Sequence, residues 1–255
     1  MTDIEKDNQE EWIAGKHPVL EALRSGREIN KIWITDSAQK SLTMPIVAEA
    51  KKQGIIVQFV DKRKLDSLAE GIEVPHQGVI AQAAAFRYWE LDELVQRAKD
   101  SGETPFFLIL DEIEDPHNLG SILRTAECTG VHGVIIPKRR AAGLTATVLK
   151  TSAGAAEHVP VTRVTNLAQT IERLKEEGIW IAGTDVSAPQ DVYKTKFDLP
   201  LGIVIGNESK GMGRLIKEKC DFLVKLPMLG QLNSLNASVA AGVLMYEVVR
   251  QRRNG

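Results

Sequence analysis

Four short, almost continuously apolar runs constrain the fold of this chain more than any other feature. They read FFLIL, GVIIP, IWIAG and GIVIG, at residues 106–110, 133–137, 179–183 and 202–206. An unbroken apolar run is typical of a strand that is buried on both faces of a parallel sheet. Helical patterns separate the runs, at residues 119–128, 144–152, 167–177, 212–219 and 235–250. The sequence therefore predicts an α/β domain with a mostly parallel sheet.

The first third of the chain shows the same alternation in shorter units. Strands are expected at residues 31–35, 55–60 and 78–84, and helices at 18–23, 44–52 and 62–69. We therefore predict a small α/β domain over residues 12–86 and a larger one over residues 105–255. Residues 87–104 are rich in charge and stop before a proline, so they predict a partly helical linker. Residues 1–11 predict a disordered tail.

Composition limits the class of protein. Of 255 residues, 43% are hydrophobic and 26% are charged, which is typical of globular proteins in solution. No apolar run reaches the roughly 18 residues of a membrane helix, and the acidic N-terminus lacks a signal-peptide core. Cys128 and Cys220 form no disulfide framework and have no metal-ligand spacing. We therefore expect a reducing cytoplasm, no membrane partner and no metal site.

Charge alone does not predict a nucleic-acid partner. The formal net charge is -2, whereas nucleic-acid binders are usually basic. Basic residues cluster at 62–64, 138–140 and 250–253, but each cluster taken alone is typical of solvated surface.

Three polar segments lie next to predicted strand ends or helix starts. Residues 115–118 (DPHN) follow the first apolar run, where Pro116 presets φ and Asn118 can cap the next helix. Residues 206–208 (GNE) fit either an ordinary turn or the close approach of a ligand to glycine. Residues 234–236 (SLN) open the last helix, where serine and asparagine are also good caps. The grouping suits an adenosine-type ligand that is read by backbone groups. Neither domain starts with a Rossmann or P-loop glycine motif, which argues against Rossmann-like methyltransferases and nicotinamide enzymes.

In order, these segments resemble the three motifs of the SpoU/TrmH RNA 2′-O-methyltransferases, which belong to the knotted SPOUT superfamily. The motifs are Asn118 followed by Arg124, then IGNESKGM at residues 205–212, then LPMLGQLNSLNASVA at residues 226–240. The resemblance covers nearly the whole chain and is closest to the subgroup of 23S rRNA guanosine-2′-O-methyltransferases. That subgroup carries a small N-terminal RNA-binding domain, and His76-Gln77-Gly78 resembles one of its signatures. The resemblance implies a deep trefoil knot, which no apolar pattern can reveal.

The resemblance also implies the cofactor, S-adenosyl-L-methionine, and the residues of the site. The candidate catalytic residues are Arg124, Asn118, Glu208, Ser234 and Asn236. The candidate cofactor-binding residues are Thr184, Gly206, Leu226, Met228 and Leu235. Arginine stays protonated in proteins, so we expect Arg124 to hold a phosphate beside the target ribose and to stabilise the 2′-alkoxide. Glu208 is expected to orient an arginine or a cofactor amine.

The leading hypothesis is 2′-O-methylation of a guanosine ribose in 23S rRNA, by a homodimer that forms through the knotted domain. One alternative keeps the chemistry and changes the substrate to tRNA. Another is a non-catalytic RNA-binding protein of ribosome assembly, against which the intact Arg124, Glu208, Ser234 and Asn236 argue.

Overall fold

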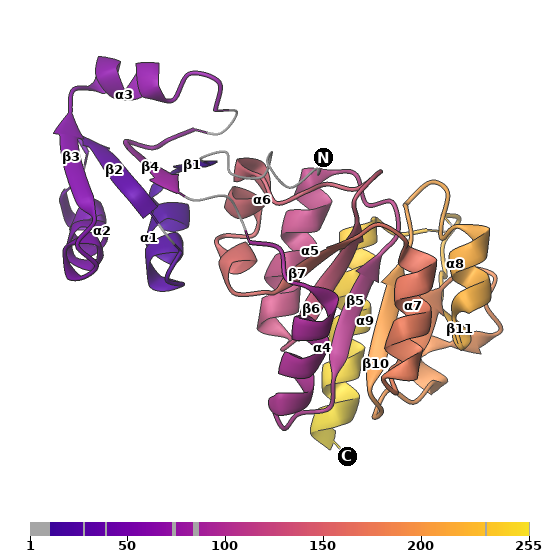
Figure 1. Ribbon diagram of the computed structural model, residues 1–255. Coiled ribbons are helices and arrows are strands. Elements are labelled where there is room, and N and C mark those ends of the chain that lie inside the picture. Colours follow the sequence, from indigo (N-terminus) through magenta and orange to yellow (C-terminus); the bar gives the residue numbers. More distant parts are fainter. Residues whose placement is uncertain are drawn as a thin grey trace, which may run out of the picture. The chain divides into compact units, whose positions relative to one another are not determined.

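The computed structural model describes residues 11–27, 29–38, 40–72, 75–83, 87–232 and 234–254 (Figure 1). Contacts divide the chain into two units, one of residues 1–87 and Gly143–His158, the other of Tyr88–Ala142 and Val159–Gly255. Of the predicted tail, residues 1–10 lie outside the described residues. The expected α/β class is confirmed, with a small N-terminal sheet and a C-terminal parallel sheet. The domain boundaries drawn from the sequence remain proposals, as does the knot.

A four-stranded sheet forms the first unit, in the order β1-β4-β2-β3. Its strands are β1 (Glu11–Ala14), β2 (Ile29–Thr35), β3 (Ile56–Val60) and β4 (Val79–Ala83). Its helices are α1 (Lys16–Arg24), α2 (Lys40–Lys52), α3 (Lys62–Leu68), α6 (Ala146–Thr151) and the 3₁₀ helix η1 (Ala155–Glu157). β2 and β3 run parallel, whereas β4 is antiparallel to β1 and β2. The sequence did not predict β1, because four residues are too few to show an alternation.

The segment Gly143–His158 packs on this unit although it lies far along the chain. Ala146 of α6 contacts the cluster that Trp33, Leu65 and Ile80 form. Arg27 and Glu157 add an ion pair at 2.9 Å in which both side chains are buried.

His76 and Gly78 build the turn before β4. The Gly78 N–H donates to His76 Nδ1 (3.0 Å), and His76 Nε2 lies 2.9 Å from a carboxylate oxygen of Asp66 on α3. Together these bonds select the tautomer in which Nδ1 accepts and Nε2 donates. Gly78 has φ 85°, and a Cβ there would lie 2.8 Å from the Thr35 side chain. The signature His76-Gln77-Gly78 therefore has a structural role, because it ties α3 to the start of β4.

A seven-stranded sheet forms the second unit, in the order β7-β6-β5-β10-β8-β11-β9, and all its neighbouring strands are parallel. Its strands are β5 (Phe106–Leu110), β6 (Gly133–Pro137), β7 (Val161–Val164), β8 (Trp180–Thr184), β9 (Gln190–Asp191), β10 (Leu201–Ile205) and β11 (Phe222–Lys225). Every residue of β5 and β10 is buried, as the apolar runs predicted. The sequence did not predict β7, which carries an arginine, or β9, which has two residues.

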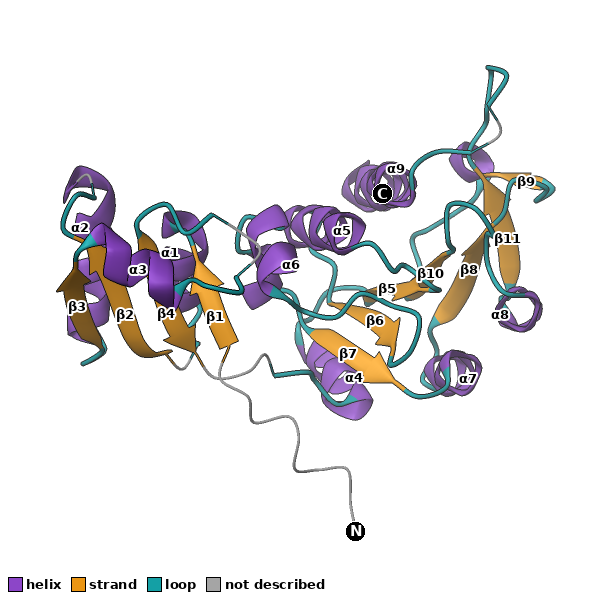
Figure 2. Cartoon of the chain, turned by 90° about the horizontal axis from the view of Figure 1, so that it is seen from above, coloured by secondary structure: helices purple, strands orange, loops and turns teal. Residues whose placement is uncertain are grey.

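Helices cover both faces of this sheet (Figure 2). They are α4 (Leu91–Asp100), α5 (Pro116–Cys128), α7 (Leu167–Glu176), α8 (Arg214–Lys219), α9 (Ala237–Asn254) and the 3₁₀ helix η2 (Val192–Lys194). Figure 2 shows α5 and α9 on one face and α4, α7 and α8 on the other. α4 lies within the predicted linker, and its Leu94, Val95 and Ala98 are buried in the core. In the described part of the chain, no helix is long and apolar enough to span a bilayer.

Candidate active site

The carboxyl ends of β8, β10 and β11 border a cavity of about 490 Å³. This edge of a parallel sheet is where ligands bind in α/β folds. Ala237, Ala240 and Leu244 of α9 also line the cavity. All five predicted cofactor residues line it, namely Thr184, Gly206, Leu226, Met228 and Leu235, together with Glu208 and Ser234.

The loop after β10 is a tight turn that its own backbone closes. The Asn207 N–H donates to the Gly211 carbonyl (3.1 Å), and the Gly211 N–H donates to the Asn207 carbonyl (2.8 Å). A Cβ on Gly206 would lie 2.4 Å from the Met212 nitrogen. Glycine is therefore required at position 206 by the chain's own backbone. The sequence had left open an ordinary turn and the approach of a ligand, and the backbone contact supports the turn.

One carboxylate oxygen of Glu208, which lines the cavity, connects residues of all three motifs. Glu208 Oε1 accepts from Asn118 Nδ2 (2.6 Å), from Asn236 Nδ2 (2.9 Å) and from the Ala237 N–H (3.3 Å). Asn236 Nδ2 also donates to Asn118 Oδ1 (2.8 Å). Asn118 is buried, so each of its polar atoms needs such a partner. This ring of bonds, which we call the amide–carboxylate network, fixes the starts of α5 and α9 against the loop after β10.

Of the predicted polar residues, Asn236 caps a helix and Asn118 does not. Asn236 does cap α9, because its Oδ1 accepts from the N–H groups of Ser238 (3.0 Å) and Val239 (3.2 Å). At α5 the capping residue is Asp115, whose Oδ1 accepts from the His117 N–H at 2.8 Å. The expectation that Asn118 caps α5 is therefore wrong. Asn118 lies inside the first turn, where its amide contacts Glu208 instead.

Arg124 lies outside the amide–carboxylate network and does not line the cavity. Its side chain is exposed on α5, and in the described part of the chain its guanidinium has no hydrogen-bond or ion-pair partner. Among the same residues Glu208 contacts two asparagines and no arginine, so the expected pairing with an arginine is absent. Arg124 is therefore free to meet a ligand.

Two carboxylates that the sequence motifs did not indicate lie near the cavity. Asp185 follows β8 and lines the cavity. Burial acts to raise its pKa, but hydrogen bonds from Lys217 (2.8 Å) and Ser187 prevail and hold the pKa below its usual value. Asp111 follows β5, where burial raises its pKa although the Gly213 N–H donates to it at 2.7 Å. Their position directly after apolar runs was the available signal in the sequence.

Glu112 connects the three loops at this edge of the sheet. Its carboxylate accepts from Arg140 (2.8 Å) and lies 3.7 Å from Lys210 Nζ, and its backbone carbonyl accepts from Asn207 Nδ2 (3.0 Å). The bond from Arg140 is the main reason that the pKa of Glu112 is lowered. No group of three or more His, Cys, Asp or Glu side chains that could hold a metal ion occurs in the ranges that the structure describes.

Two known families match the chain over most of its length. Residues 105–246 match the SpoU rRNA Methylase family, and residues 12–89 match the family described as RNA 2′-O ribose methyltransferase substrate binding. The two matched ranges contain the larger and the smaller sheet, respectively. The resemblance inferred from the motifs is thereby confirmed.

Relatives and solved structures agree with this assignment. The chain is 57% identical over 244 residues to YacO of Bacillus subtilis (strain 168), named for the TrmH family of tRNA/rRNA methyltransferases, with 96% of this chain and 97% of YacO covered. It is 55% identical over 240 residues to a protein of Staphylococcus haemolyticus (strain JCSC1435) named for the same family, with 94% and 95% covered. The crystal structure of the SpoU methyltransferase AviRb from Streptomyces viridochromogenes, in complex with the cofactor AdoMet, superimposes with a TM-score of 0.80 at 25% identity and covers 96% of this chain and 92% of AviRb. S-adenosyl-L-methionine is thus the cofactor of this family, as expected. The chain belongs to the SpoU rRNA methylase family.

Proposed function

We propose that this protein transfers a methyl group from S-adenosyl-L-methionine to the 2′-oxygen of a guanosine ribose in 23S rRNA. The observation that carries the proposal is the amide–carboxylate network of Asn118, Glu208 and Asn236, of which Glu208 lines the cavity. These residues come from three distant segments, and their bonds hold the polar groups of all three motifs together. Such a preformed arrangement is what positioning catalysis needs.

The cavity suits the cofactor in size and in lining. Its volume of about 490 Å³ lies within the range of small-molecule sites. Apolar side chains such as Leu226, Met228 and Leu235 suit an adenine ring, while Thr184 and the backbone at Gly206 provide polar groups. When bound, the sulfonium of the cofactor supplies an electrophilic methyl group. No metal ion is needed for this reaction.

The chain's own residues supply position and charge. The exposed Arg124 guanidinium would hold the phosphate beside the target ribose and stabilise the developing 2′-alkoxide. Ser234, two residues before Asn236, lines the cavity, where its hydroxyl can contact the ribose. Residues 12–86 would select the RNA, in line with the substrate-binding family that they match.

We also propose that the protein is a homodimer in the cytoplasm. Val239 and Tyr246 of α9 are 51% and 54% exposed, and seven residues separate them, so they lie on one face of the helix. An exposed apolar stripe on a helix of the parallel-sheet unit fits a self-complementary interface with a second copy.

Transfer of radiolabelled methyl groups to unmodified 23S rRNA, followed by nucleoside analysis, tests reaction, base and substrate together. We expect 2′-O-methylguanosine at about one site per molecule of RNA. Another methylated nucleoside, or no transfer to this RNA, would contradict the proposal.

The second candidate is tRNA 2′-O-methylation, because the names of the relatives cover both kinds of RNA. Unmodified tRNA in the same assay separates the two substrates. A protein that binds no cofactor in calorimetry would instead be a non-catalytic RNA-binding protein.

A further inference from the structure

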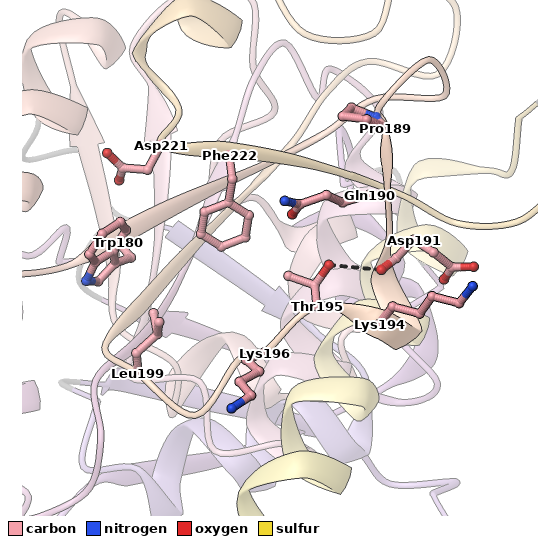
Figure 3. Close-up of a pocket in the computed structure, with 10 residues that line it drawn as sticks. All are labelled: Trp180, Pro189, Gln190, Asp191, Lys194, Thr195, Lys196, Leu199, Asp221 and Phe222. Carbon is pink, nitrogen blue, oxygen red and sulfur yellow. Dashed lines mark hydrogen bonds between the residues drawn. The ribbon is translucent and has the colours of Figure 1, made fainter.

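A second cavity, of about 660 Å³, lies in the parallel-sheet unit (Figure 3). Its lining shares no residue with the lining of the cofactor cavity. Trp180 and Phe222 form the aromatic part, and Gln190, Thr195, Lys194 and Lys196 are among its polar residues. We call it the aromatic cavity. None of the proposed catalytic or cofactor residues lines it, so methyl transfer leaves it unexplained.

The two cavities lie on the same face of the sheet, at opposite ends of two strands. Trp180 begins β8 and Thr184 ends it, and alternate residues of a strand point to one face. By the same rule Phe222 shares a face with Val224 of β11, which lines the cofactor cavity. Four residue steps separate Trp180 from Thr184, or about 13 Å along the strand. Ala182, which lies between them on the same face, is fully buried, so the two cavities are separate hollows at the two ends of β8.

The aromatic side chains form a firm surface that is open to solvent. Trp180 is 52% exposed. Phe222 is partly buried, and its ring centroid lies 6.5 Å from that of Phe197, which is fully buried. Figure 3 shows the Phe222 ring between Trp180 and Gln190, with Thr195 and Lys196 across the hollow. The exposed Trp180 indole, with the Phe222 ring in the same lining, provides an aromatic surface on which a flat ligand can stack.

The charge at the aromatic cavity favours an anionic ligand. Neither Lys194 nor Lys196, both exposed, forms an ion pair with any residue that the structure describes. The negative charge of Asp221 is compensated, because Lys175 lies 2.8 Å from one oxygen and the Ile181 N–H donates to the other at 2.8 Å. Asp191 accepts from the Tyr193 N–H and is the one acidic lining residue without an ion pair in the described chain. The lysines therefore outnumber the unpaired acid.

The lysine-bearing segment is held in place before any ligand arrives. Thr195 Oγ1 donates to the Asp191 carbonyl at 2.9 Å, the bond that is dashed in Figure 3. Gln251 of α9 donates to the Thr195 carbonyl (2.8 Å) and accepts from the Phe197 N–H (2.8 Å). These bonds fix the backbone on both sides of Lys196, so ligand binding need not order it.

We propose that the aromatic cavity is a second binding site for the substrate RNA. An unpaired base stacks on Trp180 above Phe222, Gln190 contacts the base edge, and Lys194 and Lys196 bind the flanking phosphates. Proteins that bind single-stranded nucleic acid combine these elements, aromatic platforms and cations along the backbone. The site rests on the proposed function only in that the substrate is RNA. It lies apart from the methyl-transfer site and contributes affinity and register.

The test compares RNA affinities of full-length variants by fluorescence anisotropy, with a fluorescein-labelled single-stranded RNA of about 12 nucleotides as the probe. Trp180→Ala and the double variant Lys194→Ala, Lys196→Ala should each bind about fivefold more weakly or worse, as expected for a lost base stack or lost phosphate contacts. Trp180→Phe should restore most of the affinity, because a phenyl ring still stacks. Cofactor affinity in calorimetry should not change in any of them.

Matched controls lie nearby. Tyr193→Ala removes an aromatic side chain that is 54% exposed but does not line the cavity, and Lys219→Ala removes a lysine that pairs with Glu172. Both should bind RNA like the wild type. Wild-type affinity in the Trp180→Ala protein, or equal losses in the controls, would overturn the site. The binding assay does not depend on methyl transfer. If the wild-type protein proved inactive as a methyltransferase but Trp180→Ala still weakened RNA binding, the proposed reaction would be refuted and the RNA site would stand.

Discussion

At the scale of the residue, Arg124 is a motif residue whose charge has no partner in the described chain. If its guanidinium stabilises the alkoxide, Arg124→Ala should lower the rate of methyl transfer by about 100-fold or more. The cofactor dissociation constant should stay unchanged, because Arg124 does not line the cavity. Radiolabelled transfer and calorimetry measure the two effects. Arg214→Ala is the control, since the Arg214 side chain is 91% exposed on α8. Full activity in the Arg124 variant would refute the role.

In the amide–carboxylate network, all three hydrogen bonds that Glu208 accepts end on its Oε1 atom. Glu208→Ala would leave the buried Asn118 amide without this acceptor, at a cost of about 1–3 kcal/mol in the free energy of unfolding. Glu208→Gln keeps a carbonyl oxygen for the same donors and should lose clearly less. Urea unfolding of both variants measures the difference. Equal stability of the Ala and Gln variants would show that the network does not stabilise the fold.

At the scale of the element, the turn between β10 and α8 depends on Gly206. A methyl group at Gly206 would press on the Met212 nitrogen, 2.4 Å away, and must displace backbone. We expect Gly206→Ala to lower the free energy of unfolding by about 1–3 kcal/mol and to weaken cofactor binding. Gly230→Ala, where a Cβ meets nothing within 4 Å, should change neither. Thermal unfolding and calorimetry test this, and a Gly206→Ala protein like the wild type would contradict it.

Elements also show how far the sequence could predict this fold. The apolar runs located β5, β6, β8 and β10, because most residues of these strands are apolar and buried. β9 has two residues, and its pairing with β11 depends on a long-range contact, which a local pattern does not contain. The cavity lining from Ala237, Ala240 and Leu244 depends likewise on how α9 packs on the sheet. The motif residues of the site were predicted from the resemblance to a known family. The hydrogen bonds between them could be identified only from the structure.

At the scale of the whole molecule, the exposed stripe on α9 predicts self-association. Val239→Asp combined with Tyr246→Asp would place charges in the proposed interface. The free-energy cost of desolvating these charges exceeds the stabilisation that an apolar contact provides. Light scattering should then report a monomer in place of a dimer. Leu215→Asp changes an apolar residue of α8 that is 55% exposed and should leave the dimer intact. A wild-type protein that is monomeric at all concentrations would refute the interface.

The pairing of β5 with β10 has a consequence for synthesis on the ribosome. Phe106 pairs with Leu201, so one edge of β5 has no partner until the residues up to 205 have left the exit tunnel. At about 5–20 residues per second, this wait lasts roughly 5–20 s. Throughout it, a wholly apolar strand offers unpaired N–H and C=O groups to any neighbouring nascent chain. Chains arrested before Leu201 should therefore be cleaved by protease at β5, and chains arrested well beyond Ile205 should resist.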